Sequence, residues 1–147
     1  MKLLFLLKQE KHTMTKRFLI TIGFMGAISV IFGAVGAHIL NGNIPNEHLE
    51  MFNTGNQFLM YHALALLGLA FMSRYVSRSY LNAIYFLFVI GIGLFSGTLF
   101  ILSLQEVVGF DISYITKLTP IGGILLIIGW IVIIFAGVNY QHKKRHS

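Results

Sequence analysis

The sequence predicts an all-α fold: a polytopic membrane protein in which four transmembrane helices form an antiparallel bundle. Its 147 residues are 56% hydrophobic and only 11% charged, against about 25% charged residues in ordinary soluble domains. Four stretches of 20 to 24 residues carry no formal charge, and about 20 helical residues cross a hydrocarbon core. Their apolar residues do not alternate with polar ones, so helices fit these stretches better than barrel strands do.

The four expected spans differ in how apolar they are. The first, third and fourth contain few polar residues, whereas the first third of the second carries Asn53, Thr54, Asn56 and Gln57. Short loops between the spans force neighbouring helices to run antiparallel. The spans cover residues 18–40, 52–72, 81–104 and 120–140.

Proline and acidic residues mark two of the helix starts. Thr119 precedes Pro120, which predicts a threonine N-cap and a proline in the first turn, where its missing N–H has no consequence. The fourth span is therefore expected to begin at Pro120. Glu47 and Glu50 follow soon after Pro45, and acids stabilise a helix start, so we expect a surface turn of helix that runs into the second span.

The basic residues gather on one side of the predicted membrane domain. Ten of the eleven lie before the first span, between the second and third, or after the fourth, and four of the five acids lie on the other side. The positive-inside rule then places both termini in the cytoplasm. Topology and contact with anionic lipid explain the net charge of +6, so we expect the lipid bilayer and no nucleic acid as a partner.

Three regions follow from this topology. Residues 1–13 are expected to be either a leader outside the native start or a cytoplasmic tail, because their apolar stretch is shorter than a signal peptide needs. Residues 14–140 form the predicted four-helix membrane domain. Residues 141–147 form a basic cytoplasmic tail.

Small residues recur at helical spacing in three of the expected spans. Lipid tails provide no hydrophobic drive for helix association, so close packing depends on small side chains that let backbones approach. We interpret the small residues as packing seams of a tight bundle, the alternative being a glycine-lined passage or hinge. The predicted helix-packing residues are Gly26, Ser29, Gly33, Gly36, Gly93, Gly97, Gly122 and Gly129.

Polar side chains concentrate in the half of the predicted domain that faces away from the cytoplasm. An unsatisfied polar group in hydrocarbon is strongly unfavourable, so these groups predict one of two arrangements. Either they bond one another and the backbone and fix helix register, or they line a polar pocket that opens to the outer face. The candidate pocket residues are His38, Asn53, Asn56, Gln57, Tyr61, His62, Ser96 and Thr98.

Several kinds of chemistry lack the residues they need. No Asp or Glu lies within a predicted span, although proton-coupled antiport usually depends on an intramembrane carboxylate. The segment around Ser96 lacks the G-x-S-x-G spacing of a hydrolase nucleophile. The chain has no cysteine. His142 and His146 have the i, i+4 spacing of metal ligands, but they flank three basic residues that repel a cation, and Glu47, His48 and Glu50 supply only one histidine. We therefore expect no catalytic residue, no cofactor and no metal.

Four ordered motifs resemble those of one family of small membrane proteins. They are GAVGAH at 33–38, NTG at 53–55 with YHA at 61–63, LFSGTLF at 94–100, and TPIGG at 119–123 with GW at 129–130. Together they resemble the YgdD/YwdK-type membrane family, known as domain of unknown function four-two-three, over about residues 14–140. The family also has small eukaryotic transmembrane relatives. The resemblance implies a small four-helix protein of the bacterial plasma membrane, and it implies no activity, because none is established for the family.

Three functional hypotheses remain from the sequence. The leading one is a non-enzymatic membrane component that packs with itself, with lipid or in a larger assembly, as a homo-oligomer or with a membrane protein partner. The alternative is a transporter or channel subunit for a small neutral solute, which would use the outer polar pocket. The third is a membrane enzyme acting on lipid or quinone, with His38 or His62 as its base.

Overall fold

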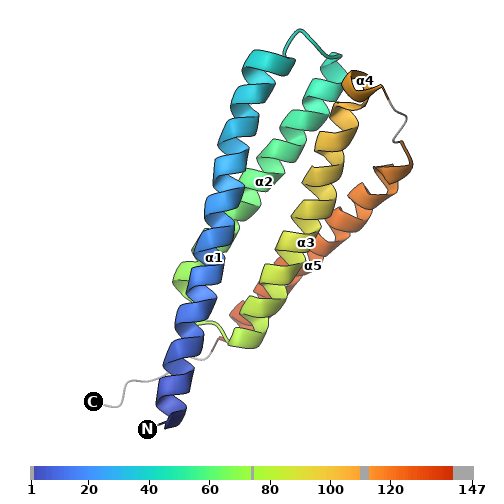
Figure 1. Cartoon of the computed structure of the whole chain (residues 1–147). Coiled ribbons are helices and arrows are strands. Elements are labelled where there is room, and N and C mark those ends of the chain that lie inside the picture. The colour runs from blue at the N-terminus through green and yellow to red at the C-terminus, as the bar shows by residue number, and fades with distance from the viewer. Residues whose placement is uncertain (1, 74, 110–112, 141–147) are drawn as a thin grey trace.

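Four long helices make up most of the chain, and Figure 1 shows how they are arranged. The structure is a computed structural model that describes residues 2–73, 75–109 and 113–140. Within these residues every regular element is helical, which confirms the predicted all-α fold. The long helices are α1 (Lys2–Val35), α2 (Asn46–Met72), α3 (Arg78–Ser103) and α5 (Leu118–Val138), and the short ones are η1 (Gly36–Leu40), α4 (Gln105–Val108) and η2 (Ser113–Lys117).

The long helices pack in chain order. α1 packs on α2, α2 on α3, and α3 on α5, and successive long helices run in opposite directions (Figure 1). The segment η1, the start of α2 and the end of α3 therefore lie at the same end of the molecule, which we call the η1 end. The start of α1 and the end of α5 lie at the opposite end.

Three of the helical segments are long and apolar enough to cross a membrane. They are Met14–Leu40, Arg78–Ser103 and Tyr114–Val138. α2 has 27 residues, so it is also long enough, but amide side chains and a histidine in its first two thirds lower its mean hydropathy. The helix predicted over 52–72 is confirmed as part of α2, and its crossing of a membrane stays a prediction.

The first long helix begins before the predicted span, and its last turn is followed by a π-helical turn. It begins at Lys2, upstream of the expected start of the span, and it passes into a π-helical turn at η1. There the Asn41 N–H donates to the carbonyl oxygen of Gly36 at 3.1 Å. This wider turn was not predicted, because π-helical turns are rare and occur mostly as single turns within an α-helix.

The start of the last long helix differs from the sequence prediction. α5 begins at Leu118, directly after η2, and Lys117 holds the N-cap position without a side-chain cap hydrogen bond. Thr119 is therefore not the N-cap, because the chain is already helical before it. Pro120 still lies in the first turn, where a backbone N–H has no partner inside the helix. α2 follows Pro45 with Glu47 in its first turn, as predicted.

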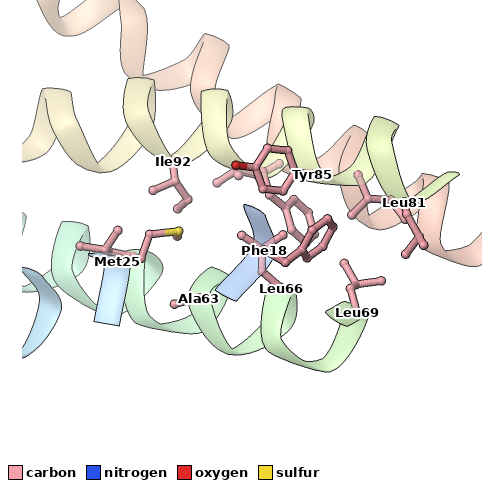
Figure 2. Close-up of a cluster of buried hydrophobic side chains, with 12 residues drawn as sticks. Phe18, Met25, Ala63, Leu66, Leu69, Leu81, Tyr85 and Ile92 are labelled. Atoms are coloured by element: carbon pink, nitrogen blue, oxygen red, sulfur yellow. The ribbon is translucent and has the colours of Figure 1, made fainter. Parts of the chain in front are cut away.

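A cluster of buried apolar side chains joins the first three long helices (Figure 2). Phe18 on α1, Leu66 on α2 and Leu81 on α3 are each at most 2% exposed. Nearer the η1 end, the rings of Phe32 and Phe100 meet edge to face with centroids 4.7 Å apart, and both also pack on Phe52. Large apolar side chains therefore hold α1 in place against α2 and α3.

The flanking helices α1 and α5 expose large apolar side chains. Phe24 on α1 is 68% exposed and Ile134 on α5 is 65% exposed. Water would disfavour so large an apolar surface, whereas lipid tails contact it without loss. The surface of these two helices is thus suited to a bilayer.

Candidate functional site

The imidazole of His62 connects α2 to α5. Its Nδ1 lies 2.9 Å from the carbonyl oxygen of Phe58, and the indole N–H of Trp130 donates to its Nε2 at 3.2 Å. A carbonyl only accepts and an indole N–H only donates, so the proton of this neutral ring is on Nδ1. The side chain is 4% exposed, and its ring meets that of Phe88 edge to face at 4.9 Å. Both ring nitrogens are therefore engaged within the bundle.

The other histidine of the predicted pocket lies elsewhere. His38 is exposed on the π-helical segment η1, and no hydrogen bond joins its side chain to another residue of the described chain. His62, in contrast, is buried where α2 meets α3 and α5. The structure therefore does not bring the two histidines together in one site.

Two asparagines line the contact between α1 and α2. The Ser29 hydroxyl donates to the carbonyl oxygen of Asn56 at 3.3 Å. A Cβ atom added at Gly33 would lie 3.4 Å from Nδ2 of Asn56, and one added at Gly36 would lie 3.1 Å from Oδ1 of Asn53. The two glycines thus let both amide side chains approach the backbone of the first helix. The Oδ1 atom of Asn56 is buried and has no hydrogen-bond partner among the described residues.

A groove of about 190 Å³ opens beside this contact, at the η1 end. Asn53 lies in its wall, and the other seven candidate pocket residues do not line it. Its shape is open rather than enclosed, so it offers a surface for a ligand and no sealed chamber for chemistry. The residues that line it are Gly33, Gly36, Ala37, Asn41, Leu49 and Asn53.

The remaining candidate pocket residues divide between the interior and the surface. Ser96 and Thr98 on α3 are at most 3% exposed, and the Ser96 hydroxyl has no hydrogen-bond partner within the described chain. Gln57 and Tyr61 on α2 are exposed. The eight predicted residues are therefore spread over the core, one groove and the outer surface.

The closest helix contact joins α3 and α5. A Cβ atom added at Gly122 would lie 2.5 Å from the backbone nitrogen of Phe95, and one at Gly129 would lie 2.5 Å from the Phe88 ring. Gly91 on α3 faces Gly122 and was missed by the sequence analysis, as was Gly55, where an added Cβ would lie 3.1 Å from a ring atom of Phe100.

Three of the predicted packing glycines make no such contact. An added Cβ atom at Gly26, Gly93 or Gly97 would have no described atom within 4 Å, apart from its own helical neighbours. Gly93 is exposed on α3. These positions therefore do not form seams between helices of the same chain.

Arg17 is a contact residue that the sequence analysis did not single out. Its Nη2 donates to Oδ1 of Asn82 at 2.6 Å, and its guanidinium carbon lies 4.3 Å from the centroid of the Tyr85 ring. The Tyr85 hydroxyl in turn lies 2.7 Å from that of Thr21. This group ties α1 to α3 at the end opposite η1. In the sequence Arg17 is only a basic residue before a span, and such residues are common on the cytoplasmic side of any membrane helix. The pattern therefore does not indicate that Arg17 contacts another helix.

The described residues contain no group of three potential ligands that could hold a metal ion. Several of their polar side chains instead join helices, as in the pairs Arg17–Asn82, Thr21–Tyr85 and His62–Trp130. The arrangement can hold a bundle together, and its groove can accept a hydrogen-bonding group from outside.

Comparisons with known proteins support the family that the sequence motifs indicate. Residues 32–123 match the model of a family described as "Protein of unknown function (DUF423)". The chain is 42% identical to "UPF0382 membrane protein YwdK" of Bacillus subtilis over 127 residues, which is 85% of this chain and 98% of that protein. It is 33% identical to "UPF0382 inner membrane protein YgdD" of Escherichia coli over 88% of this chain and 96% of that protein.

A staphylococcal relative extends this agreement. The chain is 39% identical to "UPF0382 membrane protein SAB0533" of Staphylococcus aureus, over 85% of this chain and 98% of that protein. No solved structure matches the chain significantly. Since the curated relatives are named membrane proteins and match over nearly their whole length, the chain is a membrane protein and belongs to the DUF423 family of unknown function.

Proposed function

We propose that this chain is a non-enzymatic component of the bacterial plasma membrane, a four-span bundle that packs with itself, with lipid or in a larger assembly. The observation that carries this proposal is the bonding of His62. A general base needs a free lone pair, yet Nε2 of this ring accepts from Trp130 and Nδ1 donates to Phe58. The histidine in the YHA motif thus serves helix packing.

The apolar faces of α1 and α5 support the same proposal. Exposed side chains such as Phe24 and Ile134 suit contact with lipid tails or with another membrane protein. A small bundle with such surfaces, and with both ring nitrogens of His62 engaged, favours a role in association over a role in catalytic turnover.

The proposed topology predicts a clear result with reporter fusions. Both termini should lie in the cytoplasm, because the basic residues gather at that end. A fluorescent protein fused after Ser147 should fluoresce, and alkaline phosphatase inserted after Gly42, which lies in the loop between η1 and α2, should be active. If alkaline phosphatase fused after Ser147 were active instead, the orientation would be reversed. Inactive phosphatase at Gly42 would contradict an outer loop between η1 and α2.

Native mass spectrometry of protein extracted from its own membrane into polymer nanodiscs tests the proposed role. We expect a complex heavier than one chain, containing further copies or a second membrane protein at fixed stoichiometry. A bare monomer with no bound protein or lipid would contradict the proposal. Extraction without detergent matters, because detergent strips weak partners from membrane proteins.

The groove beside η1 favours a second candidate, a transport or binding subunit for a small neutral solute. Asn53 and Gly33 lie in its wall. The amide of Asn56, whose Oδ1 has no hydrogen-bond partner among the described residues, packs against Gly33 through its Nδ2. The same mass measurement distinguishes this candidate. A homo-oligomer that carries one discrete small molecule per chain, and loses it in an Asn53→Ala variant, would favour this function over the first.

A further inference from the structure

One face of α2 stays uncovered by the other helices. Six exposed residues follow one another along it at intervals of alternately three and four: Thr54, Gln57, Tyr61, Leu64, Gly68 and Phe71. We call this set the α2 outer face. Alternation of three and four residues is the spacing by which one helix forms a seam with a second helix.

The polar part of this face distinguishes α2 from its neighbours. The exposed residues in the middle of α1 and α5 are apolar, as at Phe24, Ile31 and Ile124. The α2 outer face instead begins with a hydroxyl, an amide and a phenol. Tyr61 is 57% exposed, and no hydrogen bond joins the side chain of Thr54, Gln57 or Tyr61 to another residue of the described chain.

These polar groups lie deep along the helix. Gln57 lies eleven residues after the start of α2 at Asn46, which is about 16 Å at 1.5 Å per residue. In the four-span topology of the proposed function, on which this inference rests, that depth is inside a hydrocarbon core about 30 Å thick. An amide without a partner is strongly unfavourable there. The face therefore requires a partner that supplies hydrogen bonds.

We propose that the partner is a second copy of this chain, docked through the same face. Two copies share one orientation in the membrane, so a two-fold axis normal to the membrane places equal residues at equal depth. The amide of Gln57 both donates and accepts, as do the hydroxyls of Thr54 and Tyr61. Each group is thus able to bond its own copy across the axis.

The remainder of the face fits the same pairing. Leu64 and Phe71 are 56% and 74% exposed, and they would meet equal apolar side chains in the other copy. Gly68 lies between them, and an added Cβ atom there would have no described atom within 4 Å besides its own helix. A small residue at this position lets two helices approach closely.

Disulfide cross-linking in native membranes tests this interface directly, because the chain has no cysteine of its own. Gln57→Cys and Leu64→Cys should each give a covalent dimer on mild oxidation. Ile124→Cys is the matched control, because Ile124 is 57% exposed and lies at nearly the same depth as Gln57. Its neighbour Gly123 is near Phe95, since a Cβ atom added there would lie 3.8 Å from the Phe95 ring. The Phe95 ring in turn packs on Phe58, the residue after Gln57. The Ile124→Cys variant should stay monomeric. Equal cross-linking at all three positions would indicate random collision and overturn the interface.

A second measurement separates this inference from the proposed function. Gln57→Leu should lower the dimer association constant in lipid by a factor of about three to twenty, the range expected for an interhelical hydrogen bond in membranes. An oligomer in native mass spectrometry that neither cross-links at Gln57 nor responds to Gln57→Leu would overturn the α2 interface and leave the proposed function standing. A bare monomer in that measurement would overturn both.

Discussion

Gly122→Ala is expected to destabilise the bundle by about 3 kcal/mol, at the upper end of the usual effect of overpacking. The added Cβ atom would lie 2.5 Å from the backbone nitrogen of Phe95 and 2.8 Å from the carbonyl oxygen of Gly91. Backbone atoms in a helix cannot rotate away, so α3 and α5 would have to separate. Thermal unfolding in mild detergent, followed by circular dichroism, should show a lower midpoint than the parent chain.

Two other glycines supply graded controls for this prediction. Gly129→Ala would meet the Phe88 ring at 2.5 Å, and a ring adjusts more easily than a backbone, so its effect should be smaller. Gly93→Ala meets no described atom within 4 Å outside its own helix, and alanine favours a helix by up to about 1 kcal/mol over glycine. It should melt at or slightly above the parent temperature. Equal melting of Gly122→Ala and Gly93→Ala would contradict the close contact of α3 with α5.

The same glycines show how far sequence spacing predicts packing. Gly122 and Gly129 are seven residues apart, which places both on one face of a helix, and the structure puts that face against α3. The pair Gly93 and Gly97 also shares a face, but that face points away from the other helices. Periodicity identifies residues on a common face, and it contains no information about which helix lies opposite. Gly91 was missed because its counterpart, Gly122, lies on another helix.

For the polar residues too, spacing predicts which of them share a face but not the direction in which that face points. Asn53, Gln57 and Tyr61 are spaced by four residues, which places them along one side of a helix. The direction in which that side faces depends on where α1, α3 and α5 pack. Burial resolves it: Gln57 and Tyr61 lie outside, and His62, the next residue in the chain, lies inside. The hydrogen bond between His62 and Trp130 spans 68 positions, so no local pattern could predict it.

Removal of the His62 ring is expected to have the second large effect. His62→Ala would leave a cavity against Phe88 and remove both hydrogen bonds of the imidazole. We expect a loss of about 2–4 kcal/mol, as for other large-to-small changes in a packed core. His38→Ala is the matched control, because that histidine is exposed; its effect should stay within about 0.5 kcal/mol. Detergent melting curves of the two variants provide the comparison.

A double-mutant cycle with Trp130 decides what His62 does. Trp130→Phe keeps an aromatic ring and removes the N–H that donates to Nε2, so it should destabilise by about 1 kcal/mol. If the histidine acts as a packing residue, the two changes should couple by about 0.5–1.5 kcal/mol, and loss of stability should track loss of protein from the membrane. A catalytic base would behave differently. His62→Ala would then abolish rescue of a deletion strain at normal protein level, while Trp130→Phe, which frees the lone pair of Nε2, would preserve rescue.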